Sequence, residues 1–105
     1  MENEEFETNL LLMVAHAGDA NSKVYDALDM YEKGHVNEAY QLLDEAQEAL
    51  LIAHKSQFEL LNKEANGEKI VPSVIMIHAM DICMIAANSI QYTKKLISLM
   101  DSRKL

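Results

Sequence analysis

Apolar residues recur at intervals of three and four along three long segments of the chain, which cover about residues 5–33, 36–64 and 72–103. This spacing places the apolar residues on one face of a helix, with polar residues on the other. The first segment shows the period in Phe6, Leu10, Met13, Ala17, Val24 and Leu28, and the second in Ala39, Leu42, Leu43, Ala46, Leu50 and Ala53. The pattern predicts three long helices.

Short breaks separate the predicted helices. Gly34 ends the first, and Asn66-Gly67 is a turn signal after the second. Pro72 suits the first position of the third helix, because the N–H that proline lacks would have no partner there. Short connections between long helices favour an all-α, antiparallel three-helix bundle. A chain of 105 residues has room for one core, so we expect residues 1–105 to form a single domain.

The third helix is the most informative segment. Residues 74–87 are all apolar except His78 and Asp81. A helix that is apolar on every side must be covered on every side, yet two amphipathic partners cover only one flank of it. We therefore expect self-association through the third helix, in a closed symmetric oligomer. The alternative is a monomer whose apolar groove binds a helix of another protein.

His78 and Asp81 lie three residues apart, so they share one face of the third helix. In a seam repeated around a rotation axis, several copies of Asp81 meet and call for a cation or shared protons. Asp81 could instead pair with His78 or face solvent. A histidine beside a carboxylate suits proton transfer, metal ligation or acceptance of a phosphoryl group, or a purely structural hydrogen bond. Spacing does not choose among these.

Composition and charge narrow the class of function. Seventeen acidic and nine basic residues give a formal charge of −8, which disfavours binding to nucleic acid. Residues 1–5 read MENEE, unlike a secretory leader, and no unbroken apolar run approaches the ~20 residues that cross a membrane. These features favour a cytoplasmic protein that is not inserted in a membrane. Cys83, the only cysteine, is expected to be a small buried apolar residue.

Several short motifs occur together over nearly the whole chain. They are Ala17-Gly18-Asp19-Ala20 with Ser22-Lys23, Ala53-His54 with Gln57, Glu64-Ala65 with Gly67-Glu68, and His78-Ala79-Met80-Asp81. With these motifs in this order, the chain resembles the lactose/cellobiose (chitobiose) class of enzyme IIA proteins of the sugar phosphotransferase system. Each motif alone is weak, whereas the combination is specific.

The resemblance implies a homotrimer of three-helix subunits and a role as a histidine phosphocarrier. His78 matches the family histidine that accepts a phosphoryl group from phosphorylated HPr and passes it to a cysteine of the cognate enzyme IIB. The relay serves uptake of a β-linked disaccharide through the membrane component, enzyme IIC. Asp81 matches the aspartate whose three copies hold a metal ion, commonly magnesium, on the trimer axis.

The chain also departs from the family pattern. Met80 and Ile82 stand where family members usually have Gln and His, and Phe58 stands where they often have Thr. Gln at position 80 would donate a hydrogen bond to the histidine or to a phosphoryl oxygen, which a thioether cannot do. The alternative function is therefore a divergent regulatory or interaction module with impaired phosphotransfer.

Overall fold

Three helices of 30 residues each make up the computed structural model, which describes residues 3–103. They are α1 (Asn3–Glu32), α2 (Val36–Ala65) and α3 (Val74–Arg103), and the described part of the chain contains no strand. The three predicted helices are thus confirmed, with α1 and α2 ending within one residue of the expected positions. The third helix begins two residues later than predicted.

The chain between α1 and α2 reverses within three residues. Gly34 has φ +87°, in the left-handed region that glycine adopts without steric cost. The amide of Gly34 donates to the carbonyl of Tyr31 at 3.0 Å, and that of His35 donates to the carbonyl of Met30 at 2.8 Å. These bonds satisfy carbonyls that the end of α1 would otherwise leave without partners.

Ser73, not Pro72, sets the start of α3. The Ser73 hydroxyl accepts a hydrogen bond from the amide of Met76 at 3.2 Å, and its carbonyl accepts one from the amide of Ile77 at 3.0 Å. A serine in this place caps the free amides of the first helical turn. Pro72 therefore lies just before the cap, and the prediction that it occupies the first helical position is wrong.

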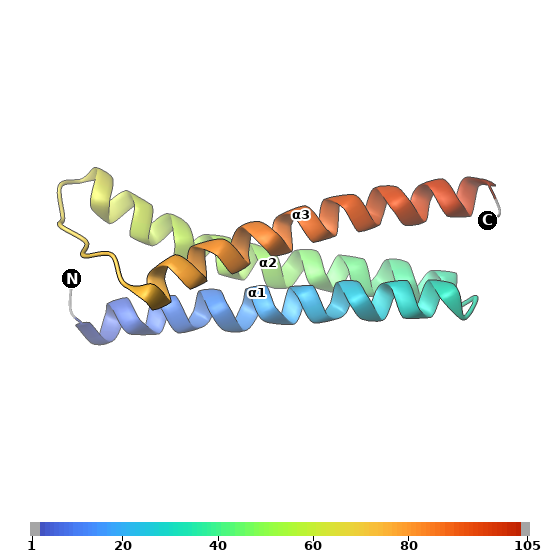
Figure 1. The fold of residues 1–105 in the computed structure, drawn as a ribbon, viewed down its shortest axis with the longest axis horizontal. Helices are drawn as coiled ribbons and strands as arrows, with labels where there is room; N and C mark the ends of the chain where they lie inside the picture. Colours follow the sequence, from blue (N-terminus) through green and yellow to red (C-terminus); the bar gives the residue numbers. More distant parts are fainter. Residues whose placement is uncertain (1–2, 104–105) are drawn as a thin grey trace.

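The three helices form an elongated body of 52 × 20 × 20 Å. Figure 1 shows α1 and α3 running away from the end where the N-terminus lies, while α2 runs back beside α1. Helix α3 packs more extensively against α1 than against α2. Part of the α2 surface that faces the α3 side is therefore left open.

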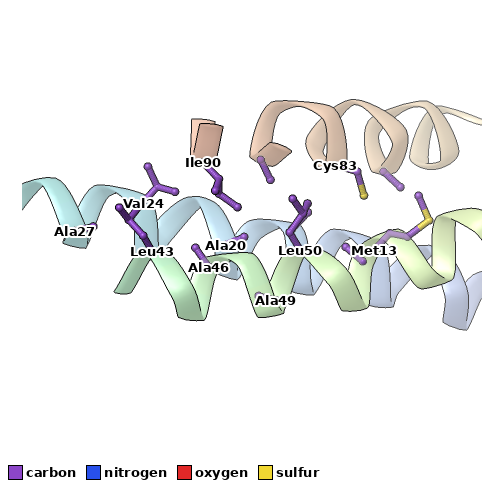
Figure 2. Close-up of a cluster of buried hydrophobic side chains, with 14 of the residues drawn as sticks. Met13, Ala20, Val24, Ala27, Leu43, Ala46, Ala49, Leu50, Cys83 and Ile90 are labelled. Carbon is purple, nitrogen blue, oxygen red and sulfur yellow. The ribbon is translucent and has the colours of Figure 1, made fainter. Parts of the chain in front are cut away.

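The core follows the same alternation of three and four residues that predicts the helices. Its fully buried members are mostly alanines on α1 and α2, which allow these two helices to approach closely. Figure 2 shows Cys83 and Ile90 of α3 directed toward the α1–α2 pair. Cys83 is buried, as expected, and burial raises the pKa of its thiol.

Candidate functional site

Helix α3 has two apolar strips on opposite sides. The inner strip is buried in the bundle and contains Ala79, Cys83, Ala86, Ile90, Thr93 and Ile97. The outer strip is exposed, and its large apolar members are Val74, Ile77, Met84, Ile85, Tyr92, Leu96 and Leu99. Val74 is 85% exposed and Met84 is 62% exposed. An exposed apolar strip of this size is typical of a surface that contacts another protein or a membrane.

Asp81 lies at the middle of the outer strip. At about 100° per residue, its side chain falls across the width of the strip between Ile77 and Met84 on one side and Ile85 on the other, and it is exposed. Within residues 3–103, no group of three His, Cys, Asp or Glu side chains converges to hold a metal ion. A single described chain therefore contributes Asp81 alone at this position.

His78 lies beside the outer strip, on the side of α3 that faces α1. Ser89 follows His78 by eleven residues, about three full turns, and with Tyr92 it lines a groove closed by Asn21 and Tyr25 of α1. His78 is exposed. In the part of the chain that the structure describes, no hydrogen bond or ion pair engages its ring, including any with Asp81. The ring nitrogens of His78 are thus accessible to a reaction partner.

Met80 lies on the opposite side of α3, which faces α2. The Gln57 side-chain amide of α2 donates a hydrogen bond to the Met80 sulfur at 3.3 Å. Further along, the ammonium group of Lys94 donates to the side-chain carbonyl of Gln47 at 3.4 Å. Since residues 78 and 80 are separated by about 200° around the helix, a side chain at position 80 does not face His78 of its own subunit.

The other three histidines have neighbours that account for them. His35 pairs with Glu38 at 3.3 Å beside the first turn. His54 is half-buried and its ring lies 6.1 Å from that of Phe58. His16 is half-buried in a groove between α1 and α2, among Asp19, Lys23, Glu45 and Glu48. In the described structure, none of these three histidines is both exposed and without a ring contact, hydrogen bond or ion pair, as His78 is.

Helix α3 is also long and apolar enough to cross a membrane, by length and composition alone. Only 22% of its most apolar window is buried inside the described structure, because the outer strip lies on the exposed side of α3. The inner strip packs on α1 and α2.

The sequence did not reveal two features of this region. The first is the bond between Gln57 and Met80, which depends on how α2 and α3 pack. The second is an exposed apolar surface on α2, where Leu51, Phe58 and Leu61 are 59%, 58% and 44% exposed. Gln57 belongs to one of the short motifs that carry the family resemblance, Ala53-His54 with Gln57. This motif was the one sequence signal that pointed to Gln57.

Comparisons with known proteins show which family this three-helix chain belongs to. Residues 8–101 match the family described as "PTS system, Lactose/Cellobiose specific IIA subunit". The lactose-specific EIIA component of Staphylococcus epidermidis is 46% identical over 72 residues, 69% of each chain. The lichenan-specific phosphotransferase enzyme IIA component of Bacillus subtilis is 37% identical over 82 residues, which is 78% of this chain and 74% of the relative.

Two solved structures share the fold along nearly the whole chain. The cellobiose-specific enzyme IIA of Bacillus anthracis aligns with a TM-score of 0.90 at 32% identity, covering 99% of this chain and 94% of the other. PtcA of S. mutans aligns with a TM-score of 0.92 at 31% identity, covering 96% and 99%. The likeness therefore extends over all three helices.

Proposed function

The chain belongs to the lactose/cellobiose-specific IIA family of the sugar phosphotransferase system, and on this premise we propose that it carries phosphoryl groups on His78. It receives the group from phosphorylated HPr and passes it to a cysteine of the cognate enzyme IIB. The observation that carries the proposal is the state of His78 itself, which is exposed and has an unengaged ring within residues 3–103. The end product is a phosphorylated β-linked disaccharide, taken up through the membrane component, enzyme IIC.

The chemistry requires a neutral imidazole at His78. The lone pair of one ring nitrogen attacks the phosphorus of the HPr phosphohistidine. The new N–P bond forms as the donor N–P bond breaks, and the electron pair of that bond returns to the HPr ring. In the second step, a thiolate of enzyme IIB attacks the same phosphorus, an S–P bond forms, and His78 is regenerated. The transition state of each step is loose, so positioning and hydrogen-bond donors matter more than acid or base catalysis.

The assembly that fits the outer strip of α3 is a homotrimer of antiparallel three-helix subunits. Three copies of the strip around one axis cover each other's apolar side chains, which gives association a hydrophobic driving force. This arrangement makes α3 a subunit interface and not a membrane span. We accordingly place the protein in the cytoplasm, as a water-soluble partner of the membrane component.

The same axis provides a metal site. Asp81 lies at the middle of the strip, so three subunits bring three carboxylates together. Carboxylate oxygens suit a hard divalent cation such as Mg²⁺. The ion would neutralise like charges that otherwise repel each other. His78 lies to the side of the strip, so the metal supports assembly and takes no part in transfer.

A second function is favoured by the substitutions at Met80 and Ile82. In this alternative, the chain binds the same partners but transfers phosphoryl groups poorly, as a regulatory or interaction module. Met80 contacts Gln57 of α2 and faces away from the His78 ring of its own subunit, so the substitution at position 80 affects transfer only through a neighbouring subunit.

Phosphorylation from phosphoenolpyruvate tests the proposal. The protein is incubated with phosphoenolpyruvate, enzyme I and HPr, and its intact mass is measured under non-acidic conditions that preserve phosphohistidine. We expect one added phosphoryl group on the wild type and on His35→Ala, the matched exposed histidine, and none on His78→Ala. If a known enzyme IIA is phosphorylated in parallel while this protein is not, the phosphocarrier function is refuted and the alternative function is favoured.

A further inference from the structure

The His78 ring has one anchored neighbour on its own helix. Residues three and four positions away are the neighbours of a helical side chain, and for His78 these are Val74, Ile75, Asp81 and Ile82. The first three are exposed, whereas Ile82 is half-buried and packs against the core of the bundle. Of the four side chains, that of Ile82 is therefore held most firmly in place.

Helix α1 provides the anchor for Ile82. Asn21 of α1 and Ser89 of α3 line the same groove, and the two helices run in the same direction (Figure 1). Seven residues make about two helical turns. Val14 precedes Asn21 by seven residues and Ile82 precedes Ser89 by seven, so Val14 and Ile82 lie level with each other on facing sides of the two helices. Val14 is also half-buried against the core, and it closes the space behind Ile82.

The side chain of Ile82 is directed toward His78. Side chains of an α-helix lean toward the N-terminus, so each covers the turn that precedes its own Cα. The side chain of Ile82 therefore covers the turn that contains His78. Ile82 is rotated about 40° from His78 around the helix axis, toward the buried side of α3. One arm of its β-branched side chain then packs toward α1 while the other lies against the base of the imidazole.

Isoleucine makes this support stiff. Two heavy atoms on Cβ leave isoleucine with one strongly preferred χ1 rotamer in a helix. The His78 ring has no hydrogen bond or ion pair within residues 3–103, so no polar contact in the described chain fixes its orientation. A ring that samples several χ1 and χ2 orientations presents its reactive nitrogen correctly for only part of the time. Steric contact with Ile82 is the available means of restricting it.

We propose that Ile82 is a positioning residue, which holds the His78 imidazole in one orientation by steric contact. This inference rests on the proposed function, in which the lone pair of a ring nitrogen must be in line with the phosphorus of the donor. Ile82 touches neither the phosphoryl group nor the partner protein and acts only through the ring. Because it forms no hydrogen bond, both ring nitrogens stay free for the partner.

Two substitutions of Ile82 separate steric support from simple burial. Ile82→Leu keeps the volume and the apolar character but moves the branch from Cβ to Cγ, whereas Ile82→Val removes one methylene and keeps the branch at Cβ. If Ile82 only fills the core, leucine is tolerated at least as well as valine. If the arm at Cβ supports the ring, valine preserves the transfer rate and leucine does not.

The kinetics of phosphorylation by phosphorylated HPr measure the effect. Freedom among three χ1 wells and two χ2 orientations lowers the fraction of correctly oriented rings by about sixfold at most. We therefore expect Ile82→Leu and Ile82→Ala to lower kcat by roughly threefold to sixfold with the KM for HPr unchanged. Ile82→Val should keep the wild-type kcat.

Leu42→Ala is the matched control for lost packing. Leu42 is also half-buried against the core, but it lies near the start of α2, at the opposite end of the bundle from His78 (Figure 1). This variant should lose thermal stability, as Ile82→Ala does, and keep the wild-type kcat.

Nuclear magnetic resonance observes the ring directly. Three-bond couplings across χ1 of His78 should report a single rotamer in wild type and in Ile82→Val. The same couplings should report an average over rotamers in Ile82→Leu and Ile82→Ala. A lower stability of the folded chain does not by itself change these couplings.

The outcomes separate this inference from the proposed function. Wild-type protein that gains no phosphoryl group refutes the phosphocarrier function, and the inference with it. The inference alone is refuted if wild type is phosphorylated on His78 while Ile82→Leu and Ile82→Ala match its kcat. It is also refuted if valine and leucine at position 82 slow transfer equally, or if the His78 couplings are the same in all variants.

Discussion

A charge placed in the outer strip of α3 should dissociate the proposed trimer while leaving the single chain folded. Ile85 belongs to this strip and is 56% exposed in the subunit. Ile52 of α2 is a matched control, because it is 46% exposed and lies in the groove between α1 and α2, away from α3. In both Ile85→Glu and Ile52→Glu, the new carboxylate follows an acidic residue by four positions, Asp81 and Glu48 respectively. The repulsion between the new carboxylate and its acidic neighbour on the same helix is therefore similar in the two variants.

The size of the effect follows from the exposed fraction. Full burial of an isoleucine side chain contributes about 1.5–3 kcal/mol, so covering the exposed half of Ile85 contributes about 1 kcal/mol per subunit. Over three subunits the loss of about 3 kcal/mol weakens association roughly a hundredfold. In the proposed trimer, the three new carboxylates would be buried beside three copies of Asp81, and their burial weakens association by several kcal/mol more. Ile52→Glu remains a surface change of about 0.5 kcal/mol or less.

Sedimentation equilibrium over a range of concentrations measures the association, and circular dichroism checks the fold. We expect wild type and Ile52→Glu to remain trimeric at concentrations where Ile85→Glu is monomeric and still helical. The reasoning is refuted if Ile85→Glu stays trimeric, or if Ile52→Glu dissociates to the same extent.

Three further predictions concern the metal, the thiol and two glycines. Asp81→Leu should abolish bound Mg²⁺ in elemental analysis and give a trimer that melts at the same or a higher temperature, because apolar packing replaces clustered carboxylates; a trimer that falls apart would contradict this. Because burial raises the pKa of Cys83, the unfolded chain loses this proton first, so stability should fall as pH rises above the ordinary thiol value of about 8.5. Urea unfolding should show this loss in wild type and a smaller one in Cys83→Ala, and equal losses would exclude Cys83 as its source. Gly34→Ala should destabilise the fold by about 1 kcal/mol, because Gly34 has a positive φ. Gly18 lies in the interior of α1 with open space for a Cβ, so Gly18→Ala should stabilise the fold by about the same amount. Thermal unfolding measures both changes.

The helices and their turns could be predicted because the signals are local. The period of apolar residues depends on the geometry of one helix, and Gly34 and Gly67 occur where the structure has positive φ angles. The start of α3 was harder, because Pro72 and Ser73 both suit a helix start, and the hydroxyl of Ser73 provides the cap. Local competition of this kind cannot be resolved by spacing.

The candidate site was predictable only in part. That His78 and Asp81 share a face follows from their spacing, and the resemblance to a family supplied their roles. Which flank of α3 faces α2 depends on tertiary packing, so the contact between Gln57 and Met80 could not be anticipated. Met80 contacts Gln57 and faces away from the His78 ring of the same chain, and a hydrogen bond from Gln at position 80 to a phosphoryl oxygen stays a prediction. On a helix, residues two apart lie on nearly opposite sides.

Onward transfer tests the central claim most directly. Protein phosphorylated with radioactive phosphate through enzyme I and HPr is purified and mixed with the cognate enzyme IIB in a single-turnover experiment, with enzyme IIB lacking its acceptor cysteine as control. We expect the label to leave His78 and to appear on enzyme IIB only when the cysteine is present, and we expect His78→Ala never to acquire or deliver it. Label that stays on wild-type protein with competent enzyme IIB, or that reaches enzyme IIB through His78→Ala, would contradict the account.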